Sequence, residues 1–121
     1  PQYLQQYSIQ SLERDYKHYY FIIRGGTHVF VGICEATFRA EWVSSLKEKR
    51  MVVKSLVEKT RHKFNASVAE VDRQEEHKML VVGFACVSNE KSHAERMLQH
   101  ILDFMEKSTE AELISAEYEV Y

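Results

Sequence analysis

The sequence lacks a long apolar stretch, and its first residues lack the pattern of an export signal. Its longest apolar run has nine residues, Met79 to Val87, whereas a membrane-spanning helix needs about 20. A secretory signal would place a basic stretch before a hydrophobic block, and the first residues show no such order. We therefore expect a cytoplasmic protein that has no membrane partner.

Cysteine and glycine are too few, and too far apart, to form common metal or phosphate sites. The two cysteines, Cys34 and Cys86, each lie in an apolar run, so we expect both to be buried, reduced thiols. Neither Cys-x-x-Cys nor His-x-x-x-His occurs, and the four glycines lack the spacing of a phosphate-binding loop. We predict no metal and no cofactor, and the local sequence singles out no catalytic residue.

What remains is the composition of one folded domain with an unusual N-terminal part. The chain has 121 residues, of which 45% are hydrophobic and 28% charged, and this length suits one core rather than two. Residues 1–28 hold five of the seven tyrosines and four of the six glutamines. We therefore predict a domain over residues 29–121 and an extension over residues 1–28.

Two interpretations of the extension stay open. Codons for Arg24, Gly25 and Gly26 can resemble a bacterial ribosome-binding site, and Val29 stands where a GTG start would follow. On this interpretation residues 1–28 are translated leader and the native chain begins at Val29. Alternatively, the extension is a genuine part of the protein, either disordered or helical over Tyr3 to Tyr16. The intact mass of the protein from its native host distinguishes the two.

Hydrophobic periodicity predicts four strands and two helices after residue 28. Alternating or continuous apolar patterns place the strands over residues 29–39, 66–72, 78–88 and 114–120. The first helix begins at a capping box, in which Ser45 and Glu48 bond each other's backbone N–H, and closes at Asn65. Ser88 or Asn89 caps the second helix. Each helix has one apolar stripe at helical spacing.

The element order β-α-β-β-α-β predicts a ferredoxin-like α+β sandwich. In this fold two helices cover one face of a four-stranded, antiparallel-type sheet. The two most apolar strands, residues 29–39 and 78–88, are expected in the centre, where two crossovers would set them side by side and parallel. The competing arrangement, two separate βα units, is disfavoured because so short a chain provides no separate cores.

The near-neutral total charge of -2 hides a strong separation of charge along the chain. Residues 44–63 contain seven basic and two acidic residues, whereas residues 90–121 contain three basic and eight acidic ones. A basic helix can neutralise phosphates. We predict a nucleic-acid-binding face, with rRNA or a ribosomal subunit as partner, formed by Lys47, Lys49, Arg50, Lys54, Arg61 and Lys63. Among these, Lys47, Arg50, Lys54 and Arg61 have the spacing i, i+3, i+7 and i+14, which places them along one flank of the helix. The alternative is an ordinary solvated helix face.

The sheet face away from the helices offers a second hypothesis. If Cys34, Ala36 and Phe38 point to the helices, the open face carries Ile33, Glu35, Thr37 and Arg39, joined by Glu117 and Glu119. Such a face is acidic and poor in aromatic residues, so base stacking on it is disfavoured. It could instead pair with a second copy of the chain, which would form a homo-oligomeric interaction module.

An enzyme is the third hypothesis, and it would need a site assembled across the strands. Cys34 or Glu35 would have to meet the distant His62 or His77. A nucleophile needs a base within hydrogen-bonding reach, and nothing in the spacing of these residues favours that proximity. We therefore expect a protein that is not an enzyme.

Three motifs, taken together, are specific. They are Ser45-Leu46-Lys47-Glu48-Lys49-Arg50 with Val53-Lys54-Ser55-Leu56, then Phe64 to Val71, and Val87-Ser88-Asn89. With them, residues 29–121 resemble the YlxP-like family of small bacterial proteins. The resemblance implies a ferredoxin-like fold, a cytoplasmic location and no assigned activity. Genes of that family often lie among those for transcription and translation factors, near that of ribosome-binding factor A, which implies a link to RNA or the ribosome by association only.

Overall fold

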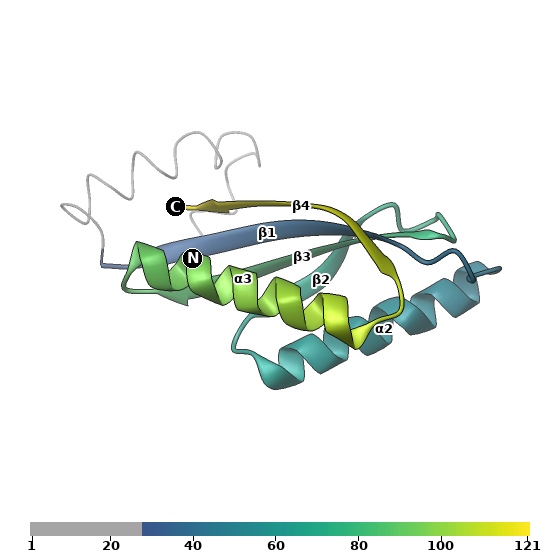
Figure 1. Cartoon of the computed structure of the whole chain (residues 1–121), viewed down its shortest axis with the longest axis horizontal. Helices are drawn as coiled ribbons and strands as arrows, with labels where there is room; N and C mark the ends of the chain where they lie inside the picture. The colour runs from purple at the N-terminus through teal and green to yellow at the C-terminus, as the bar shows by residue number, and fades with distance from the viewer. Residues whose placement is uncertain (1–27) are drawn as a thin grey trace, which may run out of the picture.

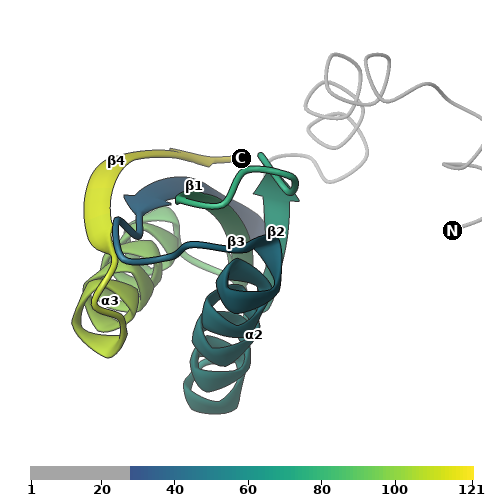
Figure 2. The ribbon, with the colours of Figure 1, turned by 90° about the vertical axis from the view of Figure 1, so that its right-hand side faces the viewer.

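Four strands and two helices alternate in the computed structural model, which describes residues 28–121 (Figure 1). In chain order they are β1 (Phe30–Arg39), α2 (Leu46–Lys63), β2 (Ser67–Asp72), β3 (Met79–Ser88), α3 (Lys91–Ser108) and β4 (Glu112–Val120). The strands form one sheet of order β2-β3-β1-β4. Both helices lie on the same face of this sheet (Figure 2). The predicted ferredoxin-like α+β fold is confirmed.

The two central strands run antiparallel, so the expectation of a parallel central pair was wrong. β1 pairs with β3 from Phe30 opposite Ser88 to Arg39 opposite Met79. The cause is the short connection between β2 and β3, which turns the chain back on itself as a hairpin. Each helical crossover instead joins two strands that run in the same direction, β1 with β2 and β3 with β4. In the sheet, a third strand lies between the two strands of each such pair. All hydrogen-bonded neighbours in the sheet are therefore antiparallel.

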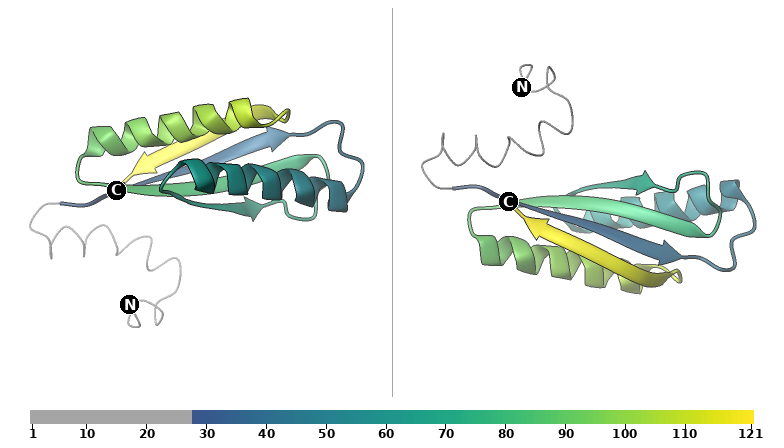
Figure 3. Two further views of the ribbon diagram at one scale, coloured as in Figure 1. Left: turned by 90° about the horizontal axis from the view of Figure 1, so that it is seen from below. Right: turned by 90° about the horizontal axis from the view of Figure 1, so that it is seen from above.

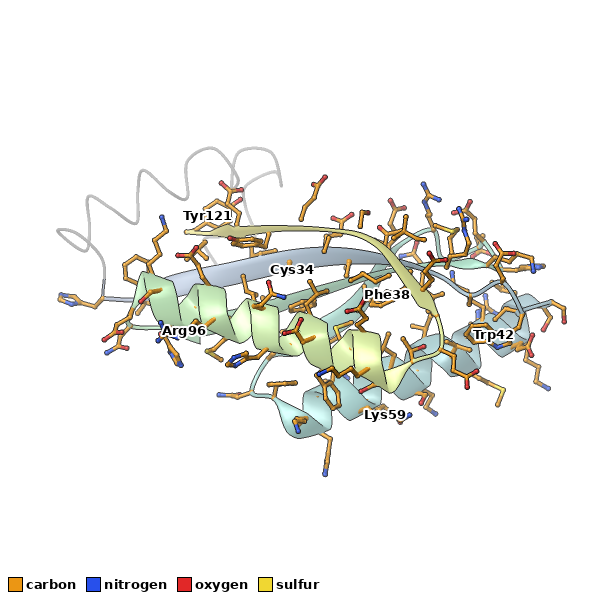
Figure 4. The ribbon with its side chains drawn as sticks, viewed as in Figure 1. Cys34, Phe38, Trp42, Lys59, Arg96 and Tyr121 are labelled. Carbon is orange, nitrogen blue, oxygen red and sulfur yellow. The ribbon has the colours of Figure 1, made fainter. Side chains whose placement is uncertain are left out.

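Alternation along β1 decides which side chains meet the helices. Cys34, Ala36 and Phe38 are buried between the sheet and the helices, in one core with residues of both helices (Figure 4). The intervening Ile33 and Glu35 are exposed on the open face of the sheet, which the right panel of Figure 3 views from above. The sequence predicted this alternation but not which set of side chains meets the helices, and the structure shows that Cys34, Ala36 and Phe38 do. Phe84 of β3, which pairs with Cys34, lies in the same core and is 2% exposed.

The helix caps agree with the sequence only in part. Glu48 donates its backbone N–H to Ser45 Oγ at 3.1 Å as predicted, but its carboxylate accepts from the N–H of Ser44 rather than Ser45. α2 ends at Lys63 with Phe64 as its C-cap, one residue before the predicted Asn65. The N-cap of α3 is Glu90, not Ser88 or Asn89. Ser88 Oγ accepts the Glu90 N–H instead, at 3.1 Å.

The predicted extension over residues 1–28 lies outside the described residues, apart from His28. Its interpretation as leader or genuine segment therefore stays a prediction, as does the boundary at residue 29. Across residues 28–121, neither helix has the length and apolarity that crossing a membrane requires.

Candidate nucleic-acid interface

Four of the six predicted cations form one exposed row on α2. Lys47, Arg50, Lys54 and Arg61 are all exposed. Successive residues of a helix are turned by about 100°, so these four side chains fall within a sector about 60° wide and extend about 21 Å along the axis. We call these four residues the basic row. The buried stripe of the same helix, Lys49, Val53, Leu56 and Thr60, runs beside it.

The basic row lies on the flank of α2 that faces away from α3. The flank toward α3 carries Lys59, His62 and Lys63, which line a shallow hollow against Phe104 of α3. Glu58 also lines this hollow and, at i, i+4 from Lys54, stands between it and the row. In Figure 2 α2 lies under β2, and α3 lies under β4 at the other edge of the sheet. The basic row is therefore on the outer side of the molecule, beside the edge strand β2.

None of the four cations of the basic row forms an ion pair with another described residue. The described pairs join Arg39 to Glu41, Lys49 to Glu70 and Arg73 to Glu76. The two carboxylates of α2 both lie near the row in the sequence, Glu48 beside Lys47 and Glu58 one turn beyond Lys54, but neither forms an ion pair with it. The positive charge of the row is therefore available to an anionic partner.

Lys49 does not belong to the exposed surface, and its place in the predicted set is corrected. Its side chain is fully buried, and its ammonium contacts Glu70 Oε2 at 2.8 Å and donates to the carbonyl of Arg73 at 2.6 Å. Glu70 Oε2 is also buried and has no hydrogen-bond partner that meets the usual angles, so the Lys49 ammonium is the polar group that compensates its burial. Lys49 thus ties α2 to the end of β2 and cannot reach a phosphate.

Lys63 is exposed but stands apart from the basic row. Its ammonium lies 5.3 Å from the centroid of the Phe104 ring, a cation–π arrangement that directs it toward α3. The Phe104 ring also meets Phe64 edge-on, with 5.4 Å between the centroids. The predicted set of six therefore divides into the row of four, one buried structural lysine and one lysine on the opposite flank.

The structure does not assemble the cross-strand catalytic site that sequence reasoning considered. Cys34 faces the helices and Glu35 faces the open side of the sheet, and no described contact joins either residue to His62 or His77. Sequence reasoning missed a different pair, in which Ser88 Oγ lies 2.8 Å from His93 Nδ1. The sequence did not indicate this pair, because Ser88 and His93 are five residues apart and lie on either side of the start of α3. No third described group orients His93, so the pair lacks the arrangement of a catalytic triad.

Both thiols are held in their protonated form. Burial, reinforced by the neighbouring Glu35 carboxylate, raises the pKa of Cys34 to about 11. Burial also raises the pKa of Cys86, although a hydrogen bond with the Gly32 backbone partly opposes this. Neither thiol is therefore an activated nucleophile. Across residues 28–121, no three side chains of His, Cys, Asp or Glu are grouped so that they could hold a metal ion.

We expect both thiols to resist alkylation by iodoacetamide at pH 8 in the folded protein and to react quickly once it is unfolded in guanidinium. The folded pKa of Cys34 exceeds that of an unfolded thiol. Its contribution to stability is therefore full below about pH 9 and is lost as the pH rises through about 11. Mass spectrometry of timed samples measures the labelling. Rapid labelling of Cys34 at pH 8 without unfolding would contradict the burial described here.

Comparison with known proteins gives three similarities. The family described as "Protein of unknown function (DUF503)" matches residues 31–118. "Uncharacterized protein YlxP" from Bacillus subtilis (strain 168) is 33% identical over 82 residues, which are 68% of this chain and 89% of that protein. A solved structure, "De novo designed protein Foldit4", has 17% identity and a TM-score of 0.45, and the match covers 77% of this chain and 96% of that one. At that distance the designed protein bears on neither fold nor function.

Proposed function

Because this chain belongs to the DUF503 family, whose function is unknown, we propose its function from the chemistry of its own surface. It is a non-enzymatic accessory protein that binds RNA through the basic row, and rRNA within a ribosomal subunit is its expected target. The resemblance to the YlxP-like family is confirmed, and the gene neighbourhood that it implies supports the ribosomal target by association.

The observation that carries this proposal is the row of four exposed cations that no described carboxylate neutralises. Cations that replace condensed counterions on a phosphate backbone supply the sequence-independent part of nucleic-acid affinity. α2 has no Phe, Tyr or Trp, and its histidine, His62, lines the hollow toward α3, so the row offers contacts to phosphates without bases stacking on it. Phosphate contacts position a protein but carry no sequence information. We therefore propose binding that recognises the RNA backbone and its shape.

The charge separation seen along the sequence is also a separation in space. α2, with the basic row, packs beside the β2 edge of the sheet, whereas β4, which has three acidic residues and no basic one, forms the other edge. An anionic surface would attract the first edge and repel the second. This polarity supports a single orientation of the protein on RNA, with the acidic edge turned away.

Binding to RNA across a salt series tests the proposal. We expect the protein to bind a fluorescent 20-nucleotide rRNA fragment, and to sediment with ribosomal subunits, at ~50 mM salt. If all four cations contact phosphates of a single strand, the plot of log affinity against log salt has a slope of about -3. Anisotropy and co-sedimentation measure the two. Absence of binding at ~50 mM salt, or affinity independent of salt, contradicts the proposal.

The open sheet face supports a second candidate, association with another copy of the chain. Three apolar side chains are exposed on it, Ile33 at 42%, Val71 at 48% and Val87 at 63%. Like charges oppose the association, since Glu35 lies directly across from Glu117. If this candidate holds, light scattering at high concentration gives twice the monomer mass, and Val87→Glu returns it to the monomer. A monomer at all concentrations contradicts it.

A further inference from the structure

We propose that a hollow at one end of the helical layer binds an arginine side chain presented by a basic segment of another protein. The hollow lies where the loop after β1, α2 and the end of α3 meet. It has a volume of about 360 Å³ and is lined by Trp42, Glu48, Met51, Val52, Ser55, Leu56, Ser108, Thr109 and Glu110. It is separate from the basic row, and its occupant does not depend on RNA binding.

Two large apolar side chains that line the hollow are exposed to solvent instead of packing in the core. The side chain of Trp42 is 46% exposed and that of Met51 is 65% exposed. Figure 4 shows Trp42 at the end of the molecule where β1 gives way to α2. A large aromatic face left open to solvent beside apolar neighbours is typical of an interaction site. A volume near the lower limit for small-molecule sites suits one side chain better than a cofactor.

The charged groups that line the hollow are all negative. Two carboxylates, Glu48 and Glu110, line it, and no cation is among its described lining residues. Glu48 uses Oε1 to accept the N–H of Ser44, which holds the carboxylate in place and leaves its second oxygen outside that bond. A cationic ligand would therefore meet opposite charge on two sides, those of α2 and of the segment that follows α3.

The C-terminus of α3 adds a third negative feature. The last carbonyls of a helix lack intrahelical partners and carry the negative end of its dipole. In α2 the backbone N–H of the C-cap returns to the Thr60 carbonyl. After α3 the Ala111 N–H, two residues beyond the C-cap Thr109, bonds to Thr109 Oγ1. Ser108 and Thr109 line the hollow, so the negative end of the α3 dipole lies at its wall.

Arginine is the side chain that uses all of these features together. Its planar guanidinium stacks on an indole face and donates several hydrogen bonds in different directions, while its stem packs on apolar groups such as Met51 and Val52. A lysine ammonium would gain the charge contacts but not the stacking. Lys107, in the last turn of α3, is exposed and does not line the hollow, so this cation of the chain itself does not occupy the proposed arginine site.

Trp42 reports directly on this hollow, because it is the only tryptophan of the chain. We would titrate the protein with acetyl-Leu-Arg-Leu-amide and excite at the red edge of indole absorption, where tyrosine does not absorb. The matched probe is the same peptide with citrulline, which has nearly the shape of arginine but no charge. We expect a saturable change in Trp42 emission at roughly millimolar arginine peptide, and binding of the citrulline peptide to be about tenfold weaker.

Two variants connect the signal to the hollow. Glu110→Gln is expected to lower the affinity for the arginine peptide about threefold or more, because it removes the charge of one exposed partner of the guanidinium. Glu95→Gln makes the same change of charge in the first half of α3, away from the hollow, and is expected to leave the affinity unchanged. The proposal is overturned if neither peptide gives a saturable signal up to ~10 mM, if both bind equally, or if Glu95→Gln weakens binding as much as Glu110→Gln.

Discussion

Reversing three charges of the basic row, with Lys47→Glu, Arg50→Glu and Lys54→Glu in one chain, is expected to lower the affinity for RNA by about 100-fold or more at low salt. The variant loses three phosphate contacts and places three carboxylates where the phosphates would lie. All three positions are exposed and none forms an ion pair with another described residue, so the fold should persist. Fluorescence anisotropy with the rRNA fragment measures the loss, and circular dichroism checks the helices.

A matched control separates the basic row from total charge. Lys59→Glu, Lys91→Glu and Lys107→Glu, combined in one chain, change the net charge by the same amount, but all three positions are exposed and lie outside the row. We expect this control to lose affinity only a few-fold, through the long-range field of the protein. Equal losses in the two triple variants would show that the location of the charge does not matter, and the row would then not be the binding site.

The second large effect is expected at Lys49, where the consequence is unfolding rather than loss of binding. Lys49→Met should lower the free energy of unfolding by about 3–5 kcal/mol, because it leaves the Glu70 carboxylate buried without its opposite charge. The Arg73 carbonyl, in a residue of positive φ, loses its hydrogen bond as well. Denaturation by urea, followed by circular dichroism, measures the change.

A second substitution shows that the loss comes from the unpaired carboxylate. In Lys49→Met combined with Glu70→Leu no charge stays buried, and replacing a buried ion pair by apolar groups is often close to neutral. We therefore expect the double variant to recover most of the stability and to bind RNA as the original chain does. A Lys49→Met chain that is as stable as the original, or that weakens RNA binding while folded, would contradict the structural role assigned here.

Local patterns in the sequence were sufficient wherever neighbouring residues decide the outcome. The capping interaction of Ser45 with the N–H of Glu48 spans one helical turn, and the alternation of Cys34, Ala36 and Phe38 depends only on the period of a strand. The basic row is of the same kind, because its spacing places it on one flank of whatever helix forms. The element order and the alternation along each strand followed from these patterns, whereas the choice of the face that meets the helices did not.

Prediction failed where the partner of a residue comes from another part of the chain. Lys49 lies in the buried stripe, four residues before Val53, but its charge suggested an exposed side chain. Nothing in the sequence indicated its burial, because its partner Glu70 is 21 residues away, on β2. Strand direction failed for a similar reason. Each crossover was treated separately, whereas the hairpin between β2 and β3 fixes how β1 and β3 meet.

The sequence by itself thus determined the elements, their order, the alternation of side chains along β1 and the row of charge on α2, because each depends on interactions within a few residues. Only the tertiary structure decided that Lys49 is structural, that Lys63 turns toward Phe104, and that Trp42 shares a hollow with the end of α3. These outcomes depend on packing between segments that are distant in the chain. Periodicity assigns such residues to a face, but it does not identify the group that each side chain meets there.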